Sequence, residues 1–233
     1  MKTQKTIGQV LNFIRERKYE SGERLLSERD FAQKLGTTRQ CVREAITALE
    51  AMRVVERRPS SGIYLRDVNS ESSFEALVLH ADTGVPLQPK EVADALETRR
   101  VLEVQAVMFA CARHTEADLA NLERNLSATR ARLDKSESIE VEDREFHQLI
   151  VASTGNHVLV RLVNAFYEMS QLRRKLFFAD PSRCRRSFEE HSRIFSAIRA
   201  RDADRASEAI DAHLSHTVAT WERLLTSGGD AAE

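Results

Sequence analysis

Three histidines and one aspartate stand where apolar side chains are expected, on the core-facing stripes of segments with helical periodicity. Asp143 and His147 are four residues apart, so both side chains leave the same face of one helix. His191 and His213 lie on the apolar stripes of two further helices. A single such histidine is more often a hydrogen-bonded core residue, but three of them with a carboxylate favour a divalent transition metal. These N and O donors suit Zn²⁺, Ni²⁺, Mn²⁺ or Fe²⁺, of which we expect Zn²⁺.

The remaining histidines are weaker candidates for a metal site. His216 lies one turn beyond His213 and is the rival ligand on the last helix. His80, His114 and His157 fall at predicted helix ends or in loops, so we expect them at the surface.

Arg99 is centred among apolar residues on a helical wheel of its segment. A buried guanidinium needs an anionic partner, because desolvation of an unpaired charge is costly. One interpretation is an internal ion pair with Glu103, four residues further on. The other is a bound effector, because the planar fork of arginine binds a carboxylate through two hydrogen bonds. The residues alone leave both interpretations open.

The elements that must position these groups are mainly helices. The chain has 233 residues, which suits two domains, and only 8 Gly and 4 Pro, which argues against a fold rich in tight turns. A polar linker is expected at 69–73, and the helical pattern after it breaks near 84–89, 113–116, 135–138, 155–156, 180–181 and 201–204. We predict a short helix over 72–82 and an antiparallel all-α bundle of six or seven helices over 74–226, with a flexible tail at 227–233.

The first 68 residues differ from the rest of the chain in charge. They hold 14 Lys and Arg against 9 Asp and Glu, a net charge of +5, whereas the remainder carries a net charge of −6. A basic head on an acidic body suggests that the head binds a polyanion such as DNA.

Residues 1–68 also have the pattern of a helix-turn-helix. A short helix stops at Gly36, and Thr37–Gln40 has the form of a capping box that opens the next helix. In this motif the start of the second helix enters the major groove, where polar side chains read base edges. The candidates for that role are Arg39, Gln40 and Arg43.

A β-hairpin is predicted after the helix-turn-helix. Val54–Arg58 and Ile63–Arg66 have the composition of short strands, and Pro59–Gly62 forms a turn between them. A hairpin at this place is a wing, so Arg57 and Arg58 would contact the DNA backbone or the minor groove.

Three stretches of the head carry a family resemblance: GERLLSERDFA at 22–32, LGTTRQCVREAI at 35–46 and the Leu-Glu pair at 49–50. They resemble the winged helix-turn-helix of GntR-family bacterial transcription regulators. The resemblance implies that double-stranded operator DNA is contacted by Arg29, Thr38, Arg39, Arg43 and Gly62.

The body carries a second resemblance, in LETRRVLE at 96–103, DREFHQLI at 143–150, Glu190-His191 and the segment 202–214. These pieces resemble the FCD-type ligand-binding domain of the FadR subfamily of GntR regulators. The metal-containing branch of that subfamily senses small carboxylates such as hydroxy acids and sugar acids. The resemblance assigns the metal to Asp143, His147, His191 and His213, which leaves His216 outside the site.

The chain lacks an apolar run long enough to cross a bilayer and lacks an apolar signal core at its start, and its three cysteines are about 70 residues apart. We therefore expect no membrane partner and a cytoplasmic location. We interpret the chain as a homodimeric, effector-responsive regulator on a palindromic operator, not an enzyme, and the resemblance implies a repressor. The rival hypotheses are a metal-dependent enzyme fused to a DNA-binding head and a DNA binder whose histidines are purely structural.

Overall fold

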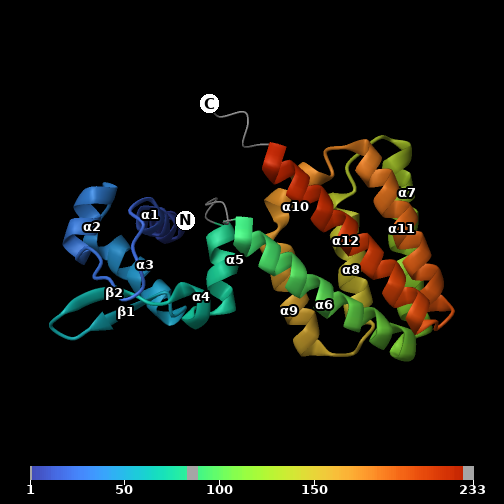
Figure 1. The fold of residues 1–233 in the computed structure, drawn as a ribbon, viewed down its shortest axis with the longest axis horizontal. Coiled ribbons are helices and arrows are strands. Elements are labelled where there is room, and N and C mark those ends of the chain that lie inside the picture. The colour runs from blue at the N-terminus through green and yellow to red at the C-terminus, as the bar shows by residue number, and fades with distance from the viewer. Residues whose placement is uncertain (1, 83–88, 228–233) are drawn as a thin grey trace. The chain divides into compact units, whose positions relative to one another are not determined.

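The computed structural model describes residues 2–82 and 89–227. They belong to two compact units, Met1–Leu87 and Gln88–Glu233, each with a hydrophobic core of its own (Figure 1). Helices dominate both units, and the strands of the described residues form one two-stranded hairpin. The predicted fold class, mainly α with a small β-hairpin in the head, is confirmed.

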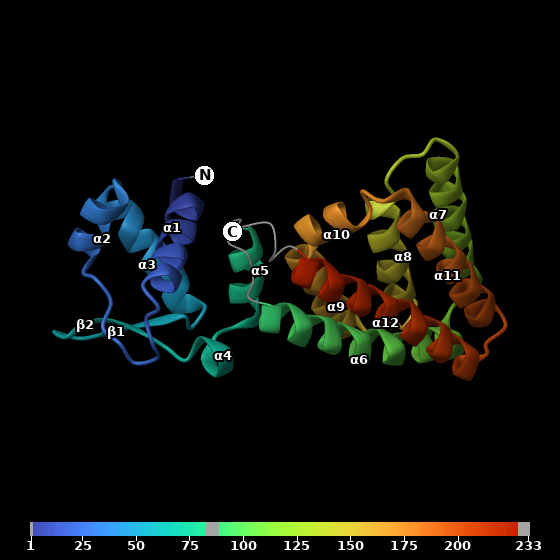
Figure 2. The same cartoon turned by 45° about the horizontal axis from the view of Figure 1, so that its top comes forward.

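Three helices of the first unit pack around one apolar core: α1 (Lys2–Glu16), α2 (Glu28–Leu35) and α3 (Arg39–Ala51) (Figure 2). Apolar residues at helical spacing on α3 form a single buried face, because positions three and four apart lie on the same side of a helix. The fully buried side chains of this core are Val10, Phe31, Val42, Ala45, Ile46, Leu49 and, from the segment after α3, Val55.

Short-range contacts build the turn between α2 and α3. Gly36 ends α2 at φ +62°, a left-handed conformation that glycine adopts without strain. Thr38 opens α3, because its hydroxyl accepts a hydrogen bond of 3.2 Å from the backbone N–H of Cys41. The capping box expected at Thr37–Gln40 is therefore wrong, since the cap lies one residue later.

The wing consists of β1 (Val55–Arg58) and β2 (Gly62–Leu65), which pair in antiparallel fashion. Gly62 has φ +138°, and a Cβ at this position would lie 2.8 Å from Nε of Arg24. Glycine adopts this positive φ without strain, and a larger residue here would also require the flexible side chain of Arg24 to move.

Two short helices follow the wing within the first unit, α4 (Val68–Glu71) and α5 (Phe74–Asp82). Ala76 and Leu79 of α5 pack against the core of the head. The segment expected as a linker at 69–73 thus contains most of α4, and the short helix expected over 72–82 associates with the head. The functional domain limits 1–68 and 74–226 stay a prediction, and the tail at 227–233 lies almost wholly outside the described residues.

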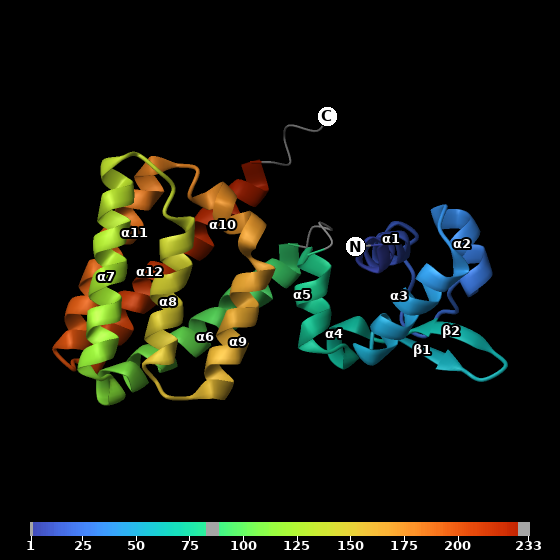
Figure 3. The same ribbon diagram turned by 180° about the vertical axis from the view of Figure 1, so that it is seen from behind.

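Seven helices form the described part of the second unit. They are α6 (Pro89–Arg113), α7 (Glu116–Asp134), α8 (Glu140–Ala152), α9 (His157–Met169), α10 (Gln171–Phe177), α11 (Pro181–Arg199) and α12 (Ala203–Ser227). Helix α12 packs between α6 and α11, while α7 packs on α8 and α11 (Figure 3). The bundle therefore brings α6, α8, α11 and α12 to one interior.

The described helix ends of the bundle follow the breaks predicted from 113–116 onward, with one addition, whereas the break predicted near 84–89 lies almost wholly outside the described residues. Thr115 and Asp118 form a capping box at α7, and Asp180 caps α11 ahead of Pro181. The break at Ser170, which separates α9 from α10, was not predicted, because that stretch contains neither glycine nor proline. Within the described part of the chain, no helix has the length and apolar character that a membrane crossing requires.

Candidate metal centre and effector cavity

The structure brings the four predicted metal ligands together at the centre of the bundle. Asp143 and His147 come from α8, His191 from α11 and His213 from α12, and one ligand atom of each lies within 4.8 Å of all the others. All four side chains are buried. The two Nε2 atoms of His147 and His213 are 3.2 Å apart, and Nε2 of His191 lies 3.4 Å from Oδ1 of Asp143. His216 lies outside this cluster.

Two carboxylates orient the imidazoles from behind. Oε2 of Glu103 lies 2.5 Å from Nδ1 of His147, and Oε2 of Glu190 lies 2.7 Å from Nδ1 of His213. A carboxylate at Nδ1 places the proton on that atom, so each Nε2 presents a lone pair to the centre. This arrangement is the usual outer shell of a histidine-bound metal.

The charge states suit metal ligands as well. Burial lowers the pKa of His147, although Glu103 opposes the shift, and burial lowers the pKa of His191 well below its ordinary value. Both imidazoles are therefore neutral near pH 7, as coordination requires. Burial by itself raises the pKa of Glu103, but Arg99 and His147 outweigh it and keep this carboxyl ionised.

Neighbouring side chains fix the other two ligands. The hydroxyl of Ser187 donates a hydrogen bond of 3.1 Å to Oδ1 of Asp143. The ring of Phe146 stacks on that of His191, with centroids 4.0 Å apart and planes 12° from parallel. Both ligands thus have restricted rotamers before any ion binds.

The contacts of Arg99 bear on both interpretations of this residue, the internal ion pair with Glu103 and the binding of an effector. Its Nε donates a hydrogen bond of 2.6 Å to Oε1 of Glu103, and its terminal nitrogen donates one of 2.6 Å to the hydroxyl of Tyr167. The hydroxyl of Tyr167 in turn donates to Oε1 of Glu103 at 2.9 Å. The internal ion pair therefore exists. Arg99 also lines a small cavity together with Asp143 and His213, so it borders the site where an effector would bind.

That cavity has a volume of about 30 Å³, close to the share of one water molecule in the liquid. Its wall combines cationic, aromatic and metal-ligand side chains from α6, α8, α10 and α12, together with the residues that flank α10. The lining residues are Leu96, Arg99, Asp143, Ser170, Arg173, Arg174, Phe177, Phe178, His213, Thr217 and Trp221.

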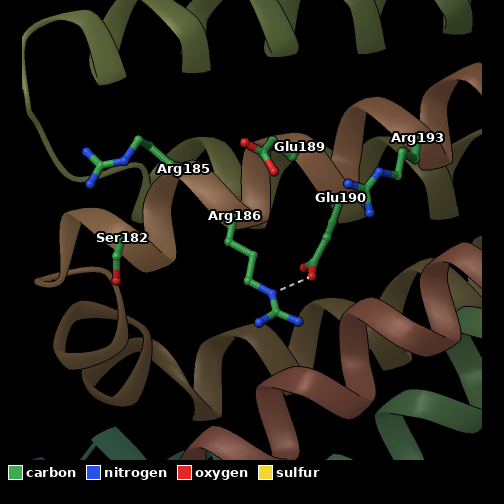
Figure 4. A pocket seen from close by; sticks show the side chains of 6 residues that line it. All are labelled: Ser182, Arg185, Arg186, Glu189, Glu190 and Arg193. Carbon is green, nitrogen blue, oxygen red and sulfur yellow. Dashed lines mark hydrogen bonds and ion pairs between the residues drawn. The ribbon is translucent and has the colours of Figure 1, made fainter.

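Glu190 links the buried cluster to the surface. Its Oε1 accepts a hydrogen bond of 2.9 Å from Nε of Arg186, while its other oxygen contacts His213. Figure 4 shows Arg186 and Glu190 turned toward one another, beside a surface hollow of about 420 Å³. Burial raises the pKa of Glu190, but His213 and Arg186 outweigh this effect and lower it. The carboxylate that orients His213 is therefore itself held by a surface arginine.

The predicted DNA-contact residues of the second helix lie at the surface of the head. Arg39 is exposed and makes no ion pair or hydrogen bond with another described residue. Gln40 donates to Glu44 at 2.9 Å, and Arg43 contacts Glu28 at 3.2 Å, with 57% of its side chain exposed. Arg29 on α2 is exposed as well, so none of these groups is tied into the core.

The two wing arginines differ from each other. Arg58 stacks on the ring of Tyr64 at 4.0 Å and stays about half exposed. Arg57 contacts Glu50 at 2.5 Å and Glu28 at 3.4 Å, so it ties the wing to α2 and α3. Arg57 would have to leave these carboxylates before it could contact DNA.

Sequence reasoning did not find several residues of the bundle interior. Glu190 lies beside His191 on α11 but contacts His213 of α12, and Tyr167 reaches the site from α9. These contacts depend on the packing of the helices and have no local signal in the sequence. Arg174 is buried on α10 while Leu172 and Leu176 of the same helix are exposed, which reverses the usual pattern. His114 was expected at the surface but is buried. It directly follows α6, and Arg201 packs there and donates a hydrogen bond of 3.0 Å to the carbonyl oxygen of His114.

His157 and His80 were also expected at the surface. His157 is exposed, as expected, and opens α9. The side chain of His80 lies outside the described residues.

Comparison with known proteins assigns both units. Residues 2–65 match the family model "Bacterial regulatory proteins, gntR family", and residues 94–216 match the FCD domain. The Uxu operon transcriptional regulator of Escherichia coli is 31% identical, with 89% of this chain and 80% of the relative covered. The galactonate operon transcriptional repressor of the same organism is 28% identical, with 82% and 84% covered.

A solved structure has the same fold. Lar, which controls the expression of the Listeria monocytogenes agr system, aligns with a TM-score of 0.63 at 18% identity, over 95% of this chain and 97% of that one. The relatives are regulators of transcription and not enzymes. The chain belongs to the GntR family of bacterial regulatory proteins, with an FCD domain as its helical body.

Proposed function

We propose that the chain is an operator-binding transcription regulator whose body holds a divalent transition metal and responds to a small carboxylate effector. The observation that carries the proposal is the buried cluster of Asp143, His147, His191 and His213, with ligand atoms within 4.8 Å of one another. FCD domains commonly bind metal, which agrees with this donor set. Zn²⁺ is expected first, and Ni²⁺, Mn²⁺ and Fe²⁺ suit the same ligands.

The donor set fits a metal better than it fits a purely structural cluster. Glu103 and Glu190 turn Nε2 of His147 and of His213 toward the same point, where two acceptors 3.2 Å apart do not satisfy one another. A cation at that point would satisfy both lone pairs. Asp143, His147, His191 and His213 would hold that cation, which would supply a Lewis acid for an anionic oxygen of the effector.

The effector class follows from the charges around the cavity. Asp143 and His213 line it beside Arg99, so an anion there would meet both the metal and a guanidinium. A hydroxy acid or a sugar acid offers a carboxylate and an adjacent oxygen, whereas a neutral sugar offers no charge. One relative is a repressor of a galactonate operon, which agrees with a sugar acid as the signal for this branch of the family.

The head supplies the contacts to DNA, as GntR-family regulators bind operator DNA. Arg39, Gln40 and Arg43 are the proposed base-reading side chains, and Arg29, Thr38, Arg58 and Gly62 the proposed backbone contacts. Thr38 acts in part through its capping of α3, because the cap sets the direction in which Arg39 leaves the helix.

A homodimer is the proposed working form. Four exposed apolar side chains on α9 and α10 support it, because a monomer rarely leaves several large apolar groups in water on adjacent elements. They are Val158, Leu162, Leu172 and Leu176. A two-fold dimer matches a palindromic operator, and an effector that prefers one dimer geometry would change the affinity for DNA.

Operator binding with and without effector tests the proposal. Metal-loaded protein should bind an operator duplex selected from a random pool, and galactonate or lactate should shift its dissociation constant about tenfold or more. Protein stripped of metal should bind the duplex but lose the response to the acid. An unchanged response after complete metal removal would contradict a metal-dependent effector site. No response to any small acid would leave a DNA binder with structural histidines.

A further inference from the structure

Three arginines line the cavity beside the cluster, and their charges are not equally balanced. Arg99 has Glu103 at 2.6 Å, and Arg174 has Glu140 at 2.8 Å. Arg173 lines the same cavity, yet its side chain has no ion pair or hydrogen bond to any described residue. It is therefore the cation of this wall for which no described residue provides a counter-charge.

The surroundings of Arg173 make that imbalance costly. Burial lowers the pKa of its guanidinium, and repulsion from Arg174 and Arg99 lowers it further. An arginine stays charged under such conditions, because its ordinary pKa lies far above neutrality. An anion in the cavity would relieve both the lost hydration and the repulsion.

The helix that carries Arg173 presents its charges inward. On α10 (Gln171–Phe177), Arg173 and Arg174 line the cavity, while Leu172 and Leu176 are 66% and 59% exposed. A helix that only covered a core would turn its leucines inward and its arginines outward. The exposed leucines belong to the apolar surface assigned above to the dimer, whereas the two arginines give the cavity wall a positive charge that suits an anion.

We propose that Arg173 binds a second anionic group of the effector, so that the preferred ligands are small dianionic acids. The inference rests on the proposed function, in which the first carboxylate binds at the metal beside Asp143 and His213. It narrows the effector class from hydroxy acids and sugar acids in general to their dicarboxylate members, such as hydroxydiacids and sugar diacids.

The cavity is smaller than a dicarboxylic acid. Its volume of about 30 Å³ cannot hold a diacid unless lining side chains move. Trp221 lines the cavity, is buried and is the single tryptophan of the chain. Binding should therefore change the intrinsic tryptophan fluorescence, which gives a direct readout without a label.

Matched pairs of acids test the proposal on the metal-loaded full chain. Galactarate differs from galactonate only by its second carboxylate, and malate differs from 2-hydroxybutyrate in the same way. Each acid is added stepwise to the protein, and the fluorescence of Trp221 reports its binding. The diacid of each pair should bind about tenfold tighter, as expected for one more charge-assisted contact. Arg173→Gln should weaken the diacid more than the monoacid and so reduce the difference to less than about twofold, with metal content unchanged. Arg173→Lys should retain part of the difference.

The control is Lys175→Gln, which removes a positive charge from the exposed side of the same helix and should keep the full preference. Equal affinity for the two acids of each pair in the parent protein, or a preference that survives Arg173→Gln, would overturn the role of Arg173 and leave the proposed function standing. Failure of every acid to bind metal-loaded protein would overturn the proposed function, and the role of Arg173 with it.

Discussion

The head and the body use charged residues in opposite ways. In the head, Arg39 and Arg43 project from a helix whose other face is apolar, and water or a surface carboxylate balances them. In the body, Arg99, Glu103 and His147 lie inside the bundle, where each polar side chain has a partner within 2.6 Å. Substitutions of the exposed residues should therefore have independent effects, whereas substitutions of the buried residues should have coupled effects on stability.

The largest effect is expected from Glu103. Glu103→Ala leaves the guanidinium of Arg99 buried without its carboxylate, and loss of one partner of a buried pair costs about 3–5 kcal/mol of unfolding free energy. Urea denaturation followed by circular dichroism measures it. The matched control is Asp211→Ala, which removes an exposed partner of Arg100 and should leave the midpoint almost unchanged. Equal stability of the two variants would contradict the proposed interdependence of the interior charges.

A smaller effect, on the metal alone, is expected from Glu190. Glu190→Gln weakens the contact that holds the proton on Nδ1 of His213, and loss of such an orienting partner lowers metal affinity about 10–100-fold. Competition with a chromogenic chelator measures the affinity. Glu189→Gln, one residue earlier and exposed, should leave it unchanged. If both variants bind metal as the parent does, Glu190 does not position His213.

The smallest effect on the fold is expected from Arg39. Arg39→Ala should weaken operator binding by about 1–3 kcal/mol if it reads a base edge, with the melting temperature unaltered. Fluorescence anisotropy with a selected duplex measures the affinity. Arg57→Ala, in contrast, should lower the melting temperature of the head, because Glu50 and Glu28 lose the arginine that both of them contact. An Arg39 variant with parental affinity would show that the recognition helix is assigned wrongly.

The sequence predicted those parts of the site that depend on helical periodicity. Asp143, His147, His191 and His213 stood on apolar stripes, so their convergence followed once the helices packed. Glu103 was found as the mate of Arg99, because residues four apart on one helix meet. Glu190, Tyr167 and Arg173 were not found, because their roles depend on which helix lies opposite, and no local pattern encodes that.

The same distinction applies to the fold. The helices and the wing followed from apolar spacing and turn residues, whereas the break at Ser170 has no glycine or proline to mark it. The association of α5 with the head core was missed, since apolar residues such as Ala76 and Leu79 do not specify which unit they join. The contacts of Arg57 with Glu50 and Glu28 were not predicted, because they depend on the tertiary structure, and its contact with DNA stays a prediction.

Metal content tests the central proposal most directly. Elemental analysis of gently purified protein should find up to one divalent transition metal per chain. The substitutions His147→Gln, His191→Gln and His213→Gln should each remove most of it from protein that retains its helical circular dichroism. His216→Gln should retain the metal, because His216 lies outside the cluster. Folded protein that takes up no divalent metal, or His216→Gln protein that loses it as fully as His213→Gln protein, would contradict a metal centre formed by these four residues.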